Sequence, residues 1–212
     1  MRIFLGILSL VLCLQAHESW LLADQYRIQP GDTLTVFTGN GHYFPASVTA
    51  LAQRLIAKEY IILPGGEMEL CASSPAGKAR KTRLSISTPG LAVVVTELSR
   101  KPGGPTQHWL RSCVEVGEGV NATYRPQKKG LEIVPLQRPA DWQSGNSLHF
   151  RLLDDGQPLR SQVFVSFNGN RSTYVTPAEN GRFQIDASIP GTLLMVALDG
   201  PRSCSLTLEL KP

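Results

Sequence analysis

The segment Thr88-Pro89-Gly90-Leu91-Ala92-Val93-Val94-Val95 places a Pro-Gly turn directly before an unbroken apolar run. In the second half of the chain, Ile189-Pro190-Gly191 precedes another apolar run, Leu193-Leu194-Met195-Val196. In both places the order of residues predicts a strand that enters, a turn at Pro-Gly and an apolar strand that returns. The repeated plan indicates a protein built from β-strands and short turns.

A second pair of similar segments supports an internal duplication. Gln29-Pro30-Gly31-Asp32-Thr33-Leu34 resembles Gln143-Ser144-Gly145-Asn146-Ser147-Leu148, and each reads as a turn that opens a strand. We favour duplication over a chance likeness between common turn sequences. Further strands are predicted by short apolar or alternating runs at Thr33–Phe37, Tyr60–Leu63, Leu84–Ile86, Leu148–Leu152 and Gln162–Phe167.

These patterns predict an all-β fold with two tandem antiparallel β-sandwich domains of the immunoglobulin-like or transthyretin-like sort. The polar stretch Tyr124–Gly130 contains Pro and Gly and is the expected boundary, which gives domains at 17–127 and 131–212. Only residues 47–58 have a weak helical stripe, and a single helical turn leading into a strand is expected there.

The first residues have the layout of a secretory signal peptide. Arg2 is followed by an apolar run from Ile3 to Leu14 and by the small residue Ala16. The run is shorter than the about 20 residues that a transmembrane helix needs. We therefore expect a signal peptide at 1–16, cleavage after Ala16 and an exported protein whose first residue is His17.

Composition and charge exclude several classes of function. The formal net charge is +4, from 21 Lys and Arg against 17 Asp and Glu, which is too mild to predict a nucleic-acid or membrane partner. The one basic cluster, 78–83, reads as a solvated loop and strand end. Neither a P-loop, a dinucleotide-binding fingerprint nor a serine elbow is present, so no catalytic residues are expected.

Export would place the cysteines in an oxidising compartment, where disulfides persist. Cys71 and Cys113 lie in the first half and could pair, which would leave Cys204 free. The sequence leaves this pairing open. No Cys/His spacing typical of a zinc site occurs, so the cysteines read as structural.

His17 is the first candidate metal ligand. An N-terminal histidine carries a primary amine and an imidazole on one residue, which together chelate a transition metal. The free amine has a pKa of about 7.7 to 8.0, so a metal can displace its proton at neutral pH. The alternative is an ordinary residue close to a terminus that is processed elsewhere.

The other candidates are His42 and His108. His42 lies in Gly39–Pro45, where two glycines and a proline predict a tight loop of the kind that carries binding residues; the alternative is a turn whose aromatic residues cover the core. His108 is a third candidate, and His149 alternates with apolar residues and is expected to face solvent. Two imidazoles and an amine would form a T-shaped brace that suits copper, nickel or cobalt.

Several segments together resemble a known family. They are His17–Leu21, Pro30–Thr33, Gly41–Pro45, Val114–Gly117, Gly130–Leu136, Asp155–Leu159 and Asn180–Phe183, of which Gly-Leu-Glu-Ile-Val-Pro-Leu at 130–136 is the most specific. They resemble a bacterial periplasmic family, catalogued as a domain of unknown function, that includes the extra periplasmic component of some nickel/cobalt energy-coupling-factor transporters. The resemblance covers essentially the whole chain after the leader.

This resemblance implies a periplasmic two-part β protein tied to metal uptake, with His17 and His42 at matching positions. The chain departs from the family at 197–204, where a histidine-bearing, aromatic-ending strand is usual. We expect an exported accessory protein that captures a divalent transition metal for a membrane transporter. The alternatives are a copper enzyme with a histidine brace, as in lytic polysaccharide monooxygenases, and a β-sandwich binding or adhesion module without metal.

Overall fold

The structure is a computed structural model that describes residues 18–118 and 122–212. The first half contains β1 (Glu18–Ala23), β2 (Arg27–Ile28), β3 (Thr33–Gly41), β4 (Ile56–Ile62), β5 (Met68–Leu70), β6 (Ser74–Ala76), β7 (Ala79–Ser85), β8 (Gly90–Ser99) and β9 (Thr106–Val116). The second half contains β10 (Leu131–Pro135), β11 (Ser147–Asp154), β12 (Gln157–Pro158), β13 (Val163–Phe167), β14 (Arg171–Val175), β15 (Arg182–Asp186), β16 (Gly191–Asp199) and β17 (Arg202–Leu210).

The chain is all β and sandwich-like, as the sequence predicted, and each predicted strand overlaps an observed one. Two short 3-10 turns are the helical elements of the described residues: Gln53–Leu55, which leads directly into β4 as expected, and Pro139–Asp141. Neither turn has the length or apolar character needed to cross a membrane.

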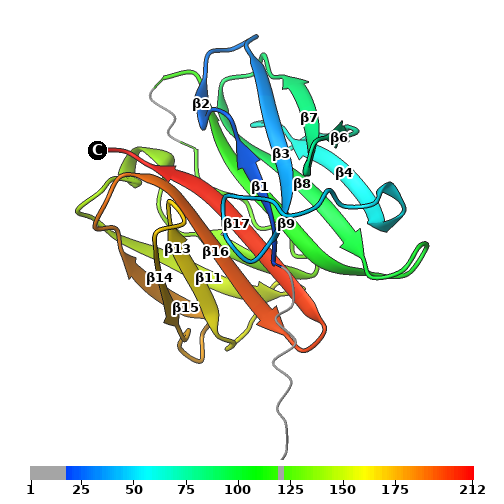
Figure 1. Ribbon diagram of the computed structural model, residues 1–212. Coiled ribbons are helices and arrows are strands. Elements are labelled where there is room, and N and C mark those ends of the chain that lie inside the picture. The colour runs from blue at the N-terminus through cyan, green and yellow to red at the C-terminus, as the bar shows by residue number, and fades with distance from the viewer. Residues whose placement is uncertain (1–17, 119–121) are drawn as a thin grey trace, which may run out of the picture.

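Three sheets build the molecule (Figure 1). The central sheet has the strand order β14-β13-β16-β17-β9-β8-β4-β5, and β2 is added beside β9. The first outer sheet has the order β1-β3-β7-β6. The second outer sheet has the order β10-β11-β12, and β15 also pairs with β11.

The two outer sheets cover opposite faces of the central sheet. On β9, Leu110 and Val114 belong to the core that contains Leu34 of β3 in the first outer sheet. The intervening positions Trp109 and Cys113 belong to the other core, together with β10 of the second outer sheet. Because successive side chains of a strand point to opposite faces, β9 is buried on both sides.

The structure supports the duplication that the sequence predicted. Strands β1-β3-β7 pair in the same order as β10-β11-β15, and β4-β8-β9 pair in the same order as β13-β16-β17. The turns before β3 and β11 also match, with Gly31 at φ 91° and Gly145 at φ 87°. Gly31 N donates to the Ile86 carbonyl and Gly145 N donates to the Ala187 carbonyl, so each turn is tied to the residue just after the matching strand.

The two halves meet where β9 and β17 pair in parallel, with His108 opposite Ser203 and Ser112 opposite Thr207. Parallel pairing of matching strands turns the second half over relative to the first, which places the outer sheets on opposite faces. The domain division at 17–127 and 131–212 stays a prediction; the sheet that crosses it was not foreseen.

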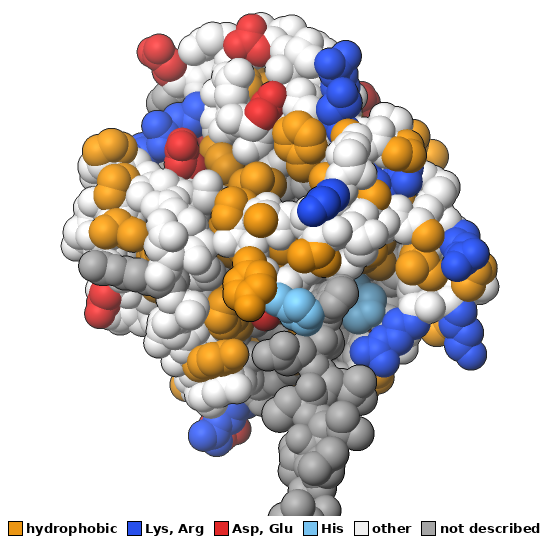
Figure 2. Space-filling view, in the orientation of Figure 1, with side chains coloured by type: hydrophobic (Ala, Val, Ile, Leu, Met, Phe, Trp, Pro, Cys, Tyr) orange, Lys and Arg blue, Asp and Glu red, His pale blue; other side chains and the backbone are white. Residues whose placement is uncertain are grey.

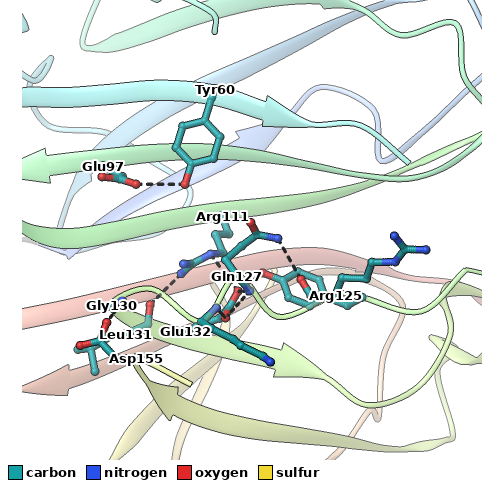
Figure 3. A network of polar contacts seen from close by, with 11 residues as sticks. Tyr60, Glu97, Arg111, Arg125, Gln127, Gly130, Leu131, Glu132 and Asp155 are labelled. Carbon is teal, nitrogen blue, oxygen red and sulfur yellow. Dashed lines mark hydrogen bonds and ion pairs between the residues drawn. The ribbon is translucent and has the colours of Figure 1, made fainter. Parts of the chain in front are cut away.

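A buried polar network also joins the halves (Figure 3). The Glu132 carboxylate on β10 accepts hydrogen bonds from the Tyr124 hydroxyl at 2.7 Å and from the Gln127 backbone N–H at 2.9 Å. Arg111 of β9 lies 3.5 Å from the same carboxylate and donates to the Leu131 carbonyl at 2.8 Å. Burial raises the pKa of Tyr124 well above 10, so its hydroxyl remains protonated and donates to Glu132.

Candidate functional site

We call Gly39–Pro45 the histidine loop, although its first three residues are the end of β3 and pair with β1, so the predicted loop begins only after Gly41. The turn that follows is anchored by one aromatic residue. Phe44 is buried and packs edge-on against Trp20 of β1, with ring centroids 5.6 Å apart. Both rings belong to a small core with Leu194 and Val196 of β16. The turn between β13 and β14 also touches the loop, because a Cβ on Gly169 would collide with the Phe44 carbonyl oxygen.

With Phe44 anchored, the two residues directly before it face outward, whereas Gly39–Gly41 are buried. His42 and Tyr43 are exposed, and their rings lie 6.5 Å apart in an edge arrangement. The loop therefore does both things that the sequence allowed: one aromatic residue covers a core, and the histidine is presented at the surface.

His108 is held by the partner strand at the seam between the halves. Its Nδ1 lies 2.7 Å from the Ser203 hydroxyl, directly across the parallel β9–β17 pair. Burial, and to a lesser extent the nearby positive charge of Arg100, lower the pKa of His108 below 6.5. The imidazole is therefore neutral at neutral pH, the form that binds metals, and the Ser203 contact leaves Nε2 as the available nitrogen.

One cavity of about 720 Å³ brings these groups together. Its lining includes Glu18 from β1, His42 from the histidine loop, and His108 with Ser203 from the seam. Burial raises the pKa of the Glu18 carboxyl above 4.5. Figure 2 shows two histidine side chains near one another on this face of the molecule.

The histidine predictions have different outcomes. His42 and His108 are far apart in the sequence and line the same cavity, while His149 is exposed on β11 and lines a different, smaller cavity. His17 lies outside the described residues. Within 18–118 and 122–212, no group of three or more His, Cys, Asp or Glu side chains could hold a metal ion.

Sequence reasoning missed the residues that β14 and β17 bring to the cavity, among them Tyr174 and Ser203. Ser203 is one of several polar residues in β17, and no motif marks it. Tyr174 is an aromatic residue that remains 62% exposed, and its strand is a short edge of the central sheet, so only the topology reveals that it faces the cavity.

Two expectations about other side chains are now resolved. Cys71, Cys113 and Cys204 are all free thiols in the structure, so Cys71 and Cys113 are not joined. The basic cluster at 78–83 is only partly solvated, because Arg80 is buried and donates to the Ser73 carbonyl at 2.7 Å. The solvated interpretation was wrong for that residue.

Several solved structures resemble this chain weakly and share little sequence with it. The D0–D1 domain of intimin is 13% identical with a TM-score of 0.30, and the match covers 91% of this chain and 97% of the D0–D1 chain. A two-domain fibronectin type III segment from chicken tenascin is 12% identical with a TM-score of 0.32, covering 92% and 99%. Salmonella alpha-2-macroglobulin is 12% identical with a TM-score of 0.37, and this chain spans 15% of it.

These TM-scores all lie below 0.5, so the likeness is weak. No curated protein matches the sequence. A family match, in contrast, covers residues 14–199, which is most of the chain. The protein therefore belongs to the family described as "Domain of unknown function (DUF4198)".

Proposed function

We propose that the protein is an exported, periplasmic metal-binding accessory that captures a divalent transition metal and passes it to a membrane transporter. The observation that carries the proposal is the shared cavity of His42 and His108. Glu18, which follows His17 directly in the sequence, lines the same cavity.

The chemistry of these donors suits a first-row transition metal. Removal of residues 1–16 would give His17 a free amine beside its imidazole, and His42 and His108 would supply further imidazole nitrogens. Nitrogen donors of this kind favour nickel, cobalt and copper over calcium or magnesium, which prefer oxygen ligands. The described residues do not make a three-ligand site by themselves, so the proposal requires the processed terminus.

His108 is suited to a supporting or ligating role. Its hydrogen-bonding contact with Ser203 fixes the orientation of the ring, as outer partners do for metal-bound histidines in general. Its lowered pKa means that little proton displacement is needed before a metal binds.

Delivery to a transporter requires a site that a partner can reach. His42 and Tyr43 are exposed at the edge of the cavity, so a docked protein could approach a bound ion directly. The resemblance to the periplasmic component of nickel/cobalt energy-coupling-factor transporters supports nickel or cobalt as the cargo, with copper as the third option.

The proposal is tested by calorimetric titration of protein that begins at His17, verified by mass spectrometry, with nickel, cobalt and copper. His42→Ala is expected to weaken binding at least about tenfold, or 1.4 kcal/mol. An added alanine before His17 is expected to have an effect at least as large, because it converts the amine into an amide.

The matched control is His149→Ala, since His149 is exposed and lies away from the cavity. It should leave the affinity unchanged. Equal binding by the protein with and without the added alanine would contradict the proposal.

A further inference from the structure

The cavity is far larger than a bare metal ion requires. A water molecule occupies about 30 Å³ of the liquid, whereas this cavity measures about 720 Å³. Volumes of roughly 300 to 1,000 Å³ are typical of pockets for small organic molecules. The described residues also supply too few donors to surround an ion, so coordination positions remain for another ligand.

The wall of the cavity carries exposed apolar side chains. Seven large hydrophobic residues are strongly exposed in the described part of the chain, and three of them line this one cavity: Tyr43 at 77%, Tyr174 at 62% and Leu198 at 52%. Phe164 packs beside Tyr174, with ring centroids 5.4 Å apart. Apolar side chains make no favourable contact with a hydrated ion, but they can pack against the carbon skeleton of an organic ligand.

Two guanidinium groups among the described side chains line the same cavity, and they differ in their partners. Arg202 is held by Asp154 through two hydrogen bonds of 2.9 Å, and by Asp199, so its charge is compensated. Arg100 is exposed and takes part in none of the ion pairs found within 18–118 and 122–212.

Arg100 lines the same cavity as His42 and His108, so its positive charge lies on the wall that faces a bound ligand. An uncompensated guanidinium repels a bare divalent cation. It attracts a carboxylate, with which it can form two parallel hydrogen bonds.

We propose that the ligand of this cavity is the metal already wrapped in a carboxylate-bearing organic chelator, and that Arg100 binds the chelator's carboxylate. This inference rests on the proposed metal-binding function and specifies the chemical form of its cargo. The histidines take the coordination positions that the chelator leaves open. The carbon atoms of the chelator contact Tyr43, Tyr174 and Leu198.

The test uses nickel citrate as the probe, with protein that begins at His17. Equilibrium dialysis with radiolabelled citrate is carried out with and without nickel, and nickel binding is followed in parallel with nickel chloride. Nickel bound to ethylenediamine serves as a chelate of positive charge. We expect citrate to be retained only when nickel is present, one citrate per protein, and the ethylenediamine complex to bind at least tenfold more weakly.

Two variants locate the effect. Arg100→Gln should weaken nickel citrate binding at least about tenfold and leave the affinity for nickel chloride unchanged or higher. Arg54→Gln removes an exposed arginine that does not line the cavity and should change neither affinity.

Binding of nickel without retention of citrate would overturn this inference and leave the proposed function standing. Binding of citrate that is insensitive to Arg100→Gln would overturn the role given to that residue. Failure to bind nickel in either form would overturn the proposed function and the inference together.

Discussion

The ion pair between Arg111 and Glu132 is buried between the two halves of the fold, and removing one of its charges should destabilise the whole protein. Each side chain is 1% exposed, and the Arg111 Nε lies 3.5 Å from the Glu132 Oε1. The substitution Glu132→Gln preserves size and keeps one oxygen that can accept the Tyr124 hydroxyl. It leaves the guanidinium of Arg111 without a counter-charge inside the protein.

The expected magnitude follows from this burial. Removing one partner of a buried pair costs about 3 to 5 kcal/mol, because the remaining charge is desolvated and uncompensated. For a protein of this size, 1 kcal/mol shifts the melting temperature by roughly 2 to 4 °C, so a fall of about 6 to 20 °C is expected.

The assay is urea unfolding of the full chain, with the free energy of unfolding extrapolated linearly to zero urea. The control is Arg160→Gln, whose ion pair with Glu179 is exposed and should contribute less than about 1 kcal/mol. Replacing Arg111 and Glu132 together by Met and Leu should recover only part of the loss, since no charge is then stranded but the Tyr124 hydroxyl and the Gln127 N–H lose their acceptor. A loss below about 1 kcal/mol for Glu132→Gln would refute the reasoning.

Three further predictions follow from local features. Gly169→Ala should destabilise the protein and weaken metal binding more than Gly77→Ala. The φ angle is positive at both positions, 73° and 62°, but only at 169 would the added Cβ collide with the histidine loop. Urea unfolding and calorimetric titration measure the two effects, and equal losses for both variants would contradict the expected collision. The free energy of unfolding should fall as the pH drops below about 6.5. The pKa of His108 is lowered in the folded protein, so the unfolded chain binds a proton at a higher pH than the folded one. His108→Gln should reduce the dependence of the free energy of unfolding on pH, measured by urea unfolding from pH 7 to 5. Burial raises the pKa of Cys113, and it raises the pKa of Cys204 to about 12. Both thiols should therefore resist alkylation at pH 8 until the protein unfolds. Rapid alkylation of the native protein, measured by mass spectrometry, would contradict this prediction.

The apolar runs from which the sequence predicted strands contain no buried charge, although Glu59, Arg80 and Glu97 are buried elsewhere in β4, β7 and β8. The apolar run after Pro89 and its counterpart after Pro190 begin strands at Gly90 and Gly191, where φ is positive in both. The turn before Thr33 is likewise where it was expected. Local turn chemistry and side-chain alternation are enough to locate such elements.

The two strands at the seam could not be found in this way. β9 contains Arg111 and Glu115, which are buried only because ion-pair partners reach them from other elements. In β17, Thr207 is fully buried and donates to the Leu21 carbonyl at 2.8 Å, yet its alternation with apolar residues suggests a solvated face. Contacts between distant segments determine the burial of these polar residues, and no local pattern encodes them.

The candidate site also contains some residues that a local sequence pattern predicted and others that depend on long-range contacts. The unusual composition of the histidine loop marked His42, and the approach of His108 to the same cavity depends on the long-range β9–β17 pairing. Arg100 and Tyr174, which contribute a positive charge and an aromatic ring to the cavity wall, lie in segments without any motif.

Because β9 and β17 pair in parallel, each repeat supplies only part of the central sheet. If the chain were cut at Lys128 and the halves separated, β9 and β17 would each become an edge strand with unpaired N–H and C=O groups. Such edges promote aggregation. The cut would also strip Val93 and Val95 of the neighbours that β10 and β17 provide. The two repeats therefore depend on each other. Gain or loss of one repeat would leave an unpaired edge strand that another segment would have to cover.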